Sequence, residues 1–170
     1  MKKLKLILNS IFANPNKNKK LDSDSLMKLS NDDLYEAIYF KLLDFVESCE
    51  NEESALAVMN ENQKAFYVLS LYDSEIQNGG LAQFFSNSTS TLAPFVSGFL
   101  EKINLKEHKN LFDDFLRNND IDLTRESLED FFAFYDIPDQ YWEDFDENYA
   151  DLSDMQNALG TLVRQNINDF

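Results

Sequence analysis

Hydrophobic residues recur along most of the chain at intervals of three and four, the spacing of one face of an α-helix. No stretch shows the sustained alternation of apolar and polar residues that is typical of a half-buried strand, and no internal repeat is evident. The pattern therefore predicts an all-α protein, a compact helical bundle of roughly seven to nine helices. The predicted helices cover residues 30–46, 52–60, 61–77, 91–103, 106–117, 124–135, 138–145 and 153–167.

Several helix ends carry local signals. Ser30 followed by Asp33 resembles a capping box, in which the side chains at the start of a helix bond to its free backbone N–H groups. Asn78, Gly79 and Gly80 predict the end of helix 61–77, because Asn and Gly tolerate the left-handed conformation that closes many helices. The other predicted starts are Thr91, which has Pro94 in the first turn, Thr124, Pro138 and Ser153.

The N-terminal residues differ from the rest of the chain. Residues 1–28 hold seven Lys against two Asp, a net charge of +5, whereas 29–170 hold eight basic and 29 acidic residues, a net charge of -21. The start superficially resembles a secretory signal, but Lys5, Asn9 and Ser10 interrupt its apolar stretch. We therefore expect a basic N-terminal arm (1–28), made of an amphipathic helix and a linker, and a single acidic all-helical domain (29–170). A self-screening tail and a degenerate signal stay open as alternatives for the arm. The apolar residues of the predicted arm helix are Leu4, Ile7, Leu8, Ile11 and Phe12.

The overall charge narrows the possible partners. The 170 residues include 31 Asp and Glu against 15 Lys and Arg, which gives a net charge of -16 and an isoelectric point near 4.3. Nucleic acids and anionic membranes would repel such a protein, so we expect it to bind neither directly and to favour a basic protein partner. Hydrophobic residues make up 44% of the chain, too many for a chain kept disordered by its charge.

The residues that most often build metal or redox sites are nearly absent. One cysteine, Cys49, cannot form an internal disulfide, and with the single histidine, His108, it cannot build a zinc site. We expect His108 to lie on a solvated helix face. Asp144 and Asp146 begin a run that resembles a calcium-binding loop, but Tyr149 stands where that loop requires glycine. The sequence therefore predicts no metal, no cofactor and a cytoplasmic location.

Carboxylates concentrate near the C-terminus. Residues 111–154 contain 15 of them against two arginines, Arg117 and Arg125, a net charge of -13. Side chains three or four apart on a helix lie about 5 to 6 Å from each other, so they can form rows of negative charge. A solvated surface is the alternative explanation for such a run. The candidate partner-binding carboxylates are Asp113, Asp114, Asp120, Asp122, Glu126, Glu129, Asp130, Asp136, Asp139, Glu143, Asp144, Asp146, Glu147, Asp151 and Asp154.

The most distinctive local string runs from Leu71 to Ala93, and its central part, from Glu75 to Ser88, reads EIQNGGLAQFFSNS. Two glycines between two apolar helical stretches predict a sharp corner, and polar side chains on both sides of it are suited to bonding free helix-end groups. The sequence leaves two interpretations open, a structural corner and a small polar pocket. The residues of the corner are Glu75, Asn78, Gly79, Gly80, Gln83, Phe84, Phe85 and Asn87.

This string resembles the signature of the bacterial DNA-mimic protein family (DMP type): Glu, an aliphatic residue, Asn, Gly-Gly, then Gln-Phe-Phe and Asn. The chain departs from that signature with Leu81 in place of an aromatic residue and Ser90 in place of a glycine. The resemblance implies an all-helical, often dimeric protein whose acidic surface imitates duplex DNA. It assigns that role to no particular carboxylate, and the aromatic residues between 131 and 145 are typical of either a core or a dimer surface.

Three functions follow, in order of preference. The first is a non-enzymatic DNA mimic that occupies the DNA-binding surface of a basic protein, such as a transcription regulator, a nucleoid protein or a nuclease. The second is an immunity or antitoxin protein that neutralises a cationic nuclease toxin. The third is an enzyme with a carboxylate pocket near Glu75 and Gln83, although no nucleophile with an adjacent base is evident there.

Overall fold

The computed structural model describes residues 26–124, 127–128, 134 and 136–170. This part of the chain contains seven α-helices and two short 3₁₀ helices, with no strand, which confirms the all-α prediction. The helix and linker predicted for the N-terminal arm lie outside the described residues. The elements are α3 (Asn31–Ser48), α4 (Glu52–Val58), α5 (Glu61–Ser86), η1 (Ser88–Leu92), α6 (Ala93–Lys102), α7 (Lys106–Asn118), α9 (Asp139–Ala150), α10 (Met155–Gln165) and η2 (Ile167–Asp169).

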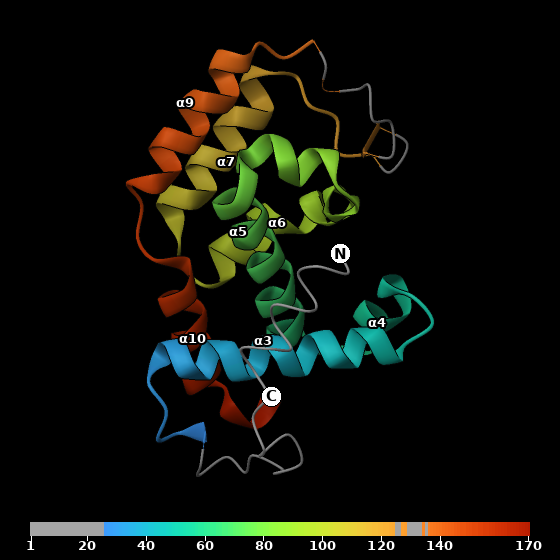
Figure 1. Cartoon of the computed structure of the whole chain (residues 1–170), viewed down its shortest axis with the longest axis vertical. Coiled ribbons are helices and arrows are strands. Elements are labelled where there is room, and N and C mark those ends of the chain that lie inside the picture. The colour runs from blue at the N-terminus through green and yellow to red at the C-terminus, as the bar shows by residue number, and fades with distance from the viewer. Residues whose placement is uncertain (1–25, 125–126, 129–133, 135) are drawn as a thin grey trace.

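The helices pack around α5, which runs through the middle of the molecule (Figure 1). At one end, α6, α7 and α9 pack around its second half. At the other end, α3 crosses below the start of α5 and packs against α10, and α4 extends beyond α3. Segments distant in sequence therefore meet at both ends of the molecule.

Helix α5 is buried on every side between Ala65 and Ser70. Each residue from Ala65 to Ser70 is buried, whereas the sequence pattern predicted a single apolar stripe. Tyr72 lies at the centre of the core, with its ring 5.3 Å from that of Phe84 and 5.5 Å from that of Phe112, both edge to face. The core therefore joins α5 to α7 through aromatic contacts.

Most helix starts predicted within the described residues lie within one or two residues of the observed ones. The helix predicted for 124–135 falls largely outside the described residues. Ser30 caps α3 by accepting a hydrogen bond from the Asp33 N–H, as its sequence predicts, and Pro138 precedes α9. The N-cap of the last helix is Asp154 instead of Ser153, since the Asp154 carboxylate accepts hydrogen bonds from the backbone N–H groups of the first turn. Thr91 lies within η1, and α6 starts after Leu92 with Pro94 in its first turn.

The segment before α3 is fixed to α10 by Arg164. Its guanidinium donates hydrogen bonds to the carbonyls of Met27 (3.0 Å) and Leu29 (2.6 Å) and to the side chain of Asn31 (3.0 Å). Gly160 permits this close approach, because a Cβ at that position would lie 2.4 Å from the Asn31 carbonyl oxygen. These contacts bring the first turn of α3 beside α10. Within the described residues, no helix has the length and apolar character needed to cross a membrane.

Candidate acidic interface

The glycine corner, defined here as Glu75 to Asn87, is a sharp kink inside α5. As predicted, the helix that starts at Glu61 stops at the two glycines, which have non-helical backbone angles, and a second helical segment starts directly after them. Gly80 has φ +80° and ψ 176°, a region of backbone space that is accessible essentially only to glycine. The kink turns Phe84 and Phe85 back into the core, where both are buried.

Glu75 holds the two sides of this corner together. Its carboxylate accepts hydrogen bonds from Gln83 Nε2 (2.5 Å), Asn87 Nδ2 (2.8 Å) and Thr89 Oγ1 (3.4 Å). Asn78 Nδ2 in turn donates to Gln83 Oε1 at 3.1 Å. The polar side chains of the corner therefore bond to one another, which favours the structural interpretation of the string over a ligand pocket.

Asp146 of α9 also belongs to the corner. Its Oδ1 accepts a hydrogen bond from the Leu81 N–H at 2.8 Å, which docks α9 against α5. The side chain is half-buried, and burial raises the pKa of Asp146, while the hydrogen bond from Leu81 opposes that shift. The sequence grouped Asp146 with the partner-binding carboxylates, but the structure directs it inward.

His108 is buried and not solvated as expected, since only 1% of its surface is exposed. Its ring packs edge to face against Tyr149 of α9, with the ring centroids 5.3 Å apart, and burial lowers the pKa of the imidazole. The Tyr149 hydroxyl donates a 2.8 Å hydrogen bond to Asp73, a buried carboxylate that the sequence analysis did not single out. Among the described residues, no group of three or more His, Cys, Asp and Glu side chains is arranged to hold a metal ion.

Asp73 gives the fold a specific pH dependence. Burial raises its pKa above the ordinary value, although hydrogen bonds from Tyr149 and two glutamines oppose the shift. Between the ordinary and the raised pKa, the folded state binds more protons than the unfolded state, so the contribution of Asp73 to stability decreases as the pH rises.

We therefore expect Asp73→Asn, which keeps an acceptor for Tyr149, to gain stability relative to the parent as the pH rises from about 4. The gain should reach about 1.4 kcal/mol for each unit by which the folded-state pKa is raised. Urea unfolding between pH 4 and pH 8 measures this difference. Asp44→Asn on the exposed face of α3 is the control, and equal pH profiles for the two variants would contradict the prediction.

A regular row of carboxylates follows the outer face of α9. The acidic row, defined as Asp139, Glu143, Glu147 and Asp151, has an interval of four residues and is exposed throughout. Helix α9 contains no Lys or Arg, and no described residue forms a hydrogen bond or ion pair with these four side chains. The opposite face of α9 packs into the core through Phe145 and Tyr149, so the row is held on a rigid support.

The charge spacing along this face can be compared with that of nucleic acid. Asp144 lies beside the acidic row, and its carboxylate is exposed and accepts a 2.7 Å hydrogen bond from the neutral amide of Gln140. The five carboxylates together span about 18 Å of helix axis, so neighbouring charges are about 4.5 Å apart on average, compared with about 3.4 Å along one DNA strand. The linear charge along this face is therefore about three quarters of that of a single strand.

The two candidate carboxylates of α7 have cationic partners. Asp113 pairs with Lys109 at 2.6 Å, and Asp114 pairs with Arg117, in each case within one turn of the same helix. These two ion pairs reduce the net negative charge that α7 presents. The sequence analysis grouped Asp113 and Asp114 with the candidate partner-binding carboxylates, whereas the structure gives each a neighbouring cation.

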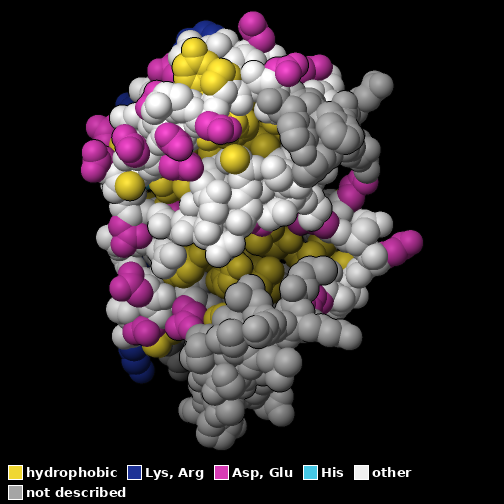
Figure 2. Space-filling model, turned by 45° about the horizontal axis from the view of Figure 1, so that its top comes forward, with side chains coloured by type: hydrophobic (Ala, Val, Ile, Leu, Met, Phe, Trp, Pro, Cys, Tyr) yellow, Lys and Arg dark blue, Asp and Glu magenta, His cyan; other side chains and the backbone are white. Residues whose placement is uncertain are grey.

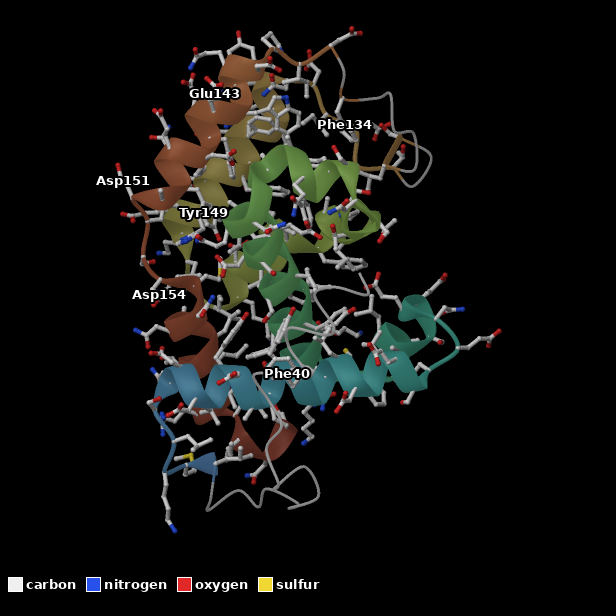
Figure 3. All side chains as sticks on the ribbon, viewed as in Figure 1. Phe40, Phe134, Glu143, Tyr149, Asp151 and Asp154 are labelled. Carbon is white, nitrogen blue, oxygen red and sulfur yellow. The ribbon has the colours of Figure 1, made fainter. Side chains whose placement is uncertain are left out.

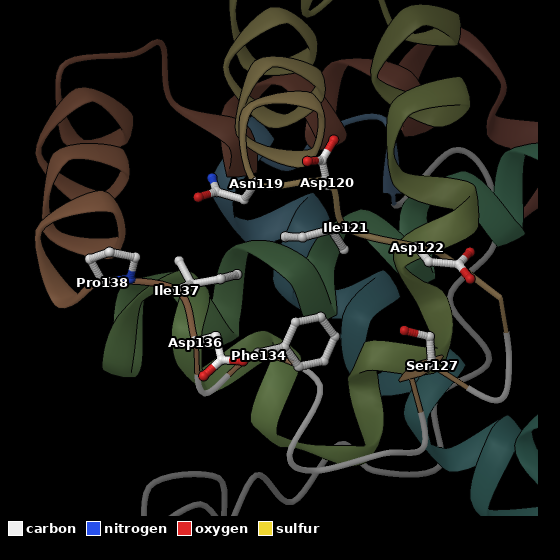
Figure 4. A pocket seen from close by; sticks show the side chains of 9 residues that line it. All are labelled: Asn119, Asp120, Ile121, Asp122, Ser127, Phe134, Asp136, Ile137 and Pro138. Carbon is white, nitrogen blue, oxygen red and sulfur yellow. The ribbon is translucent and has the colours of Figure 1, made fainter.

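Three further candidates line a pocket of about 240 Å³ beyond the end of α7 (Figure 4). They are Asp120, Asp122 and Asp136, and Phe134 and Ile121 belong to its apolar lining. Asp122 accepts hydrogen bonds from both the backbone N–H and the hydroxyl of Thr124, at 3.0 Å each. Glu126, Glu129 and Asp130 lie outside the described residues.

Exposed carboxylates continue past the end of α9. Glu143, Asp151 and Asp154 follow one another down the same side of the molecule (Figure 3), where Figure 2 also shows many Asp and Glu side chains and few Lys or Arg atoms. Asp154 caps α10, and the neighbouring Asn157 accepts a 2.7 Å hydrogen bond from Asn31 at the start of α3.

Because of that contact, the first turn of α3, which contains Asp32 and Asp33, lies beside α10. The sequence analysis did not include these two carboxylates among the candidates. The acidic first turn of α3 is visible in the sequence, but no local pattern reveals that α3 begins beside α10. The structure therefore extends the candidate interface to residues that are far from it in sequence.

Comparison with known proteins shows the family of the chain. A family model described as DMP19-like protein matches residues 57–166, which include the glycine corner and α9. The chain belongs to the DMP19-like protein family. This membership supports the resemblance to DNA-mimic proteins at the level of the family. The matched residues include all of the acidic row. No curated protein and no solved structure matches the chain significantly.

Proposed function

We propose that this DMP19-like protein is a non-enzymatic DNA mimic, and that its acidic row occupies the DNA-binding surface of a basic protein such as a transcription regulator. The observation that carries the proposal is the run of exposed carboxylates on α9, which lack cationic partners among the described residues and have about three quarters of the linear charge of a single DNA strand. Membership of the family supports the same role.

The physical basis is neutralisation of a repulsive surface. Like charges four residues apart destabilise a helix by about 0.2 to 0.5 kcal/mol per pair, and the acidic row contains three such neighbours in succession. Lys and Arg side chains that normally contact phosphates would relieve this repulsion. The rigid contacts of Phe145 and Tyr149 keep the carboxylates in place before binding, which limits the entropy lost when the partner arrives.

The glycine corner has a supporting role in this proposal. Asp146 and Leu81 attach α9 to α5, and Glu75 closes the corner through three side-chain contacts. The corner therefore fixes the position of the acidic row without touching the partner. The enzyme alternative near Glu75 gains no support from this arrangement, because the carboxylate already accepts bonds from its neighbours.

The test is capture of a partner and its competition with DNA. The purified protein is immobilised, incubated with native lysate and eluted with a salt gradient, and the recovered protein is then titrated with duplex DNA. We expect affinity to fall at least tenfold between about 50 and 200 mM salt, and DNA to displace the protein from its partner. Affinity independent of salt, or simultaneous binding of DNA and this protein to the partner, would contradict the proposal.

The same experiment separates the immunity alternative. A captured nuclease whose cleavage is blocked, together with survival of cells that co-express it with this protein, would indicate an immunity protein. A captured regulator that leaves its operator when this protein is added would support the DNA mimic.

A further inference from the structure

An apolar groove lies between α4 and the segment formed by η1 and α6. This α4–α6 groove has a volume of about 550 Å³ and is apart from the acidic row. Figure 2 shows hydrophobic side chains gathered in a hollow across the middle of the molecule. The apolar residues that line the groove are Leu56, Leu92, Pro94, Phe95 and Leu128.

The groove combines exposed apolar surface with an acidic rim. Phe95, in the first turn of α6, is 48% exposed, an unusual position for a large aromatic side chain. Glu52 and Glu53 line the opposite side, in the first turn of α4. An apolar floor with carboxylates along one edge fits a helix that has one hydrophobic face and a basic flank.

The chain itself contains such a helix in its sequence pattern. Leu4, Ile7, Leu8 and Ile11 have the i, i+3, i+4, i+7 spacing of helices that dock into grooves, and Phe12 extends the same face. Lys2, Lys3 and Lys5 fall outside this stripe. The apolar stripe of the predicted helix therefore matches the apolar lining of the groove, and its lysines are opposite in charge to Glu52 and Glu53.

The chain between this helix and the described part is long enough to reach the groove. Residues 13–25 can span about 43 Å when extended, whereas the 18 residues of α3 span about 27 Å. Arg164 fixes the segment before α3 at one end of that helix, and α4 follows the other end. The linker therefore exceeds the length of α3, and the tether gives the arm a high effective concentration at the groove.

We propose that the amphipathic segment 4–12 of the basic arm docks in the α4–α6 groove of its own chain. Its apolar face covers Phe95 and the leucines of the groove, and the adjacent Lys2 and Lys3, together with Lys5, lie toward Glu52 and Glu53. This contact keeps the arm, which has a net charge of +5 over residues 1–28, beside the acidic domain. The proposal is independent of the DNA-mimic function, because it requires no partner protein.

The test is hydrogen–deuterium exchange of the full-length protein, measured on peptides that contain residues 4–12. We expect the amides of this segment to exchange about tenfold more slowly than in the unstructured chain. Phe95→Glu should abolish that protection, because it places a charge on the apolar wall. Tyr141→Glu is the matched control, since Tyr141 also occupies the third position of an exposed helix start and is 51% exposed, but it lies in α9.

A reciprocal variant keeps the proposal falsifiable if Phe95→Glu disturbs the fold. Leu8→Glu changes only the arm, and it should increase exchange in α4 and η1 while lowering the free energy of unfolding by no more than the roughly 1.4 kcal/mol that corresponds to tenfold protection. The proposal is overturned if segment 4–12 exchanges freely in the parent, or if its protection survives Phe95→Glu in a folded protein. Protection that increases with protein concentration would instead indicate docking onto a second copy and would overturn docking within the chain.

Discussion

Gly80→Ala is expected to lower the free energy of unfolding by about 3 to 5 kcal/mol, the largest effect of any single change that we predict. With φ at +80° and ψ at 176°, Ala at this position adopts a backbone conformation that costs about 1 to 3 kcal/mol. Its Cβ would also lie 2.0 Å from Asp146 Oδ2. The Asp146 side chain must therefore move, and its hydrogen bond from the Leu81 N–H is lost.

Thermal and urea unfolding measure this loss, for which we expect a melting temperature lower by roughly 10 °C. Gly98→Ala is the control, because Gly98 lies in α6 and a Cβ there meets nothing within 4 Å. That variant should gain up to about 1 kcal/mol from helix propensity. A Gly80→Ala protein within about 1 kcal/mol of the parent would show that the corner carries no backbone strain.

A double variant separates the two contributions. In an Asp146→Ala background the clash with the new Cβ disappears, while the unfavourable backbone conformation of residue 80 remains. We expect Gly80→Ala to cost about 1 to 3 kcal/mol in that background. The cost of Gly80→Ala in the parent minus its cost in the Asp146→Ala background measures how much the displacement of Asp146 contributes to the loss of stability.

Local patterns in the sequence were enough to predict the helices of the described residues. The spacing of apolar residues located α3, α7 and α10, and Ser30 and Pro138 marked two of the starts, because caps and first turns involve neighbours in sequence. The two glycines marked the kink in α5 for the same reason. The pattern could not show that α5 is buried on every side between Ala65 and Ser70, since that depends on how many helices surround it.

Long-range contacts explain what the sequence did not reveal at the candidate site. Asp146 is separated from its partner Leu81 by 65 residues, so nothing near it distinguished an inward carboxylate from those of the acidic row. His108 was expected in solvent because its neighbours are charged, but α9 covers it with Tyr149. The ion pairs of Asp113 and Asp114 were visible as i, i+3 and i, i+4 spacings, yet charge counting alone passed over them.

The carboxylates of the acidic row are expected to lower the stability of the free protein and to raise its affinity for a basic partner. These opposite effects allow a test of function. A residue that serves only the fold usually destabilises the protein when it is replaced. Carboxylates retained for binding, in contrast, repel one another in the free protein. Neutralising them should leave the fold intact or strengthen it while weakening the interaction with a basic partner.

We therefore expect the row-neutral variant, with Asp139→Asn, Glu143→Gln, Glu147→Gln and Asp151→Asn, to lose partner affinity on the order of a hundredfold. The estimate assigns about 0.5 to 1 kcal/mol to each charge contact at the interface. The salt dependence of binding should become shallower, by about one unit of the log–log slope for each contact removed. The variant should be no less stable than the parent in urea, because the repulsion between neighbouring carboxylates is removed.

The matched control neutralises four exposed carboxylates elsewhere, Asp44, Glu50, Glu101 and Glu107, and brings the net charge to the same value, since -16 plus four is -12. Titration of the captured partner at several salt concentrations compares the two proteins. If binding responds only to net charge, both variants lose affinity equally, and α9 is not the mimicking surface. If only the row-neutral variant loses affinity, the position of the carboxylates decides recognition, as expected for a surface that imitates the ordered phosphates of DNA.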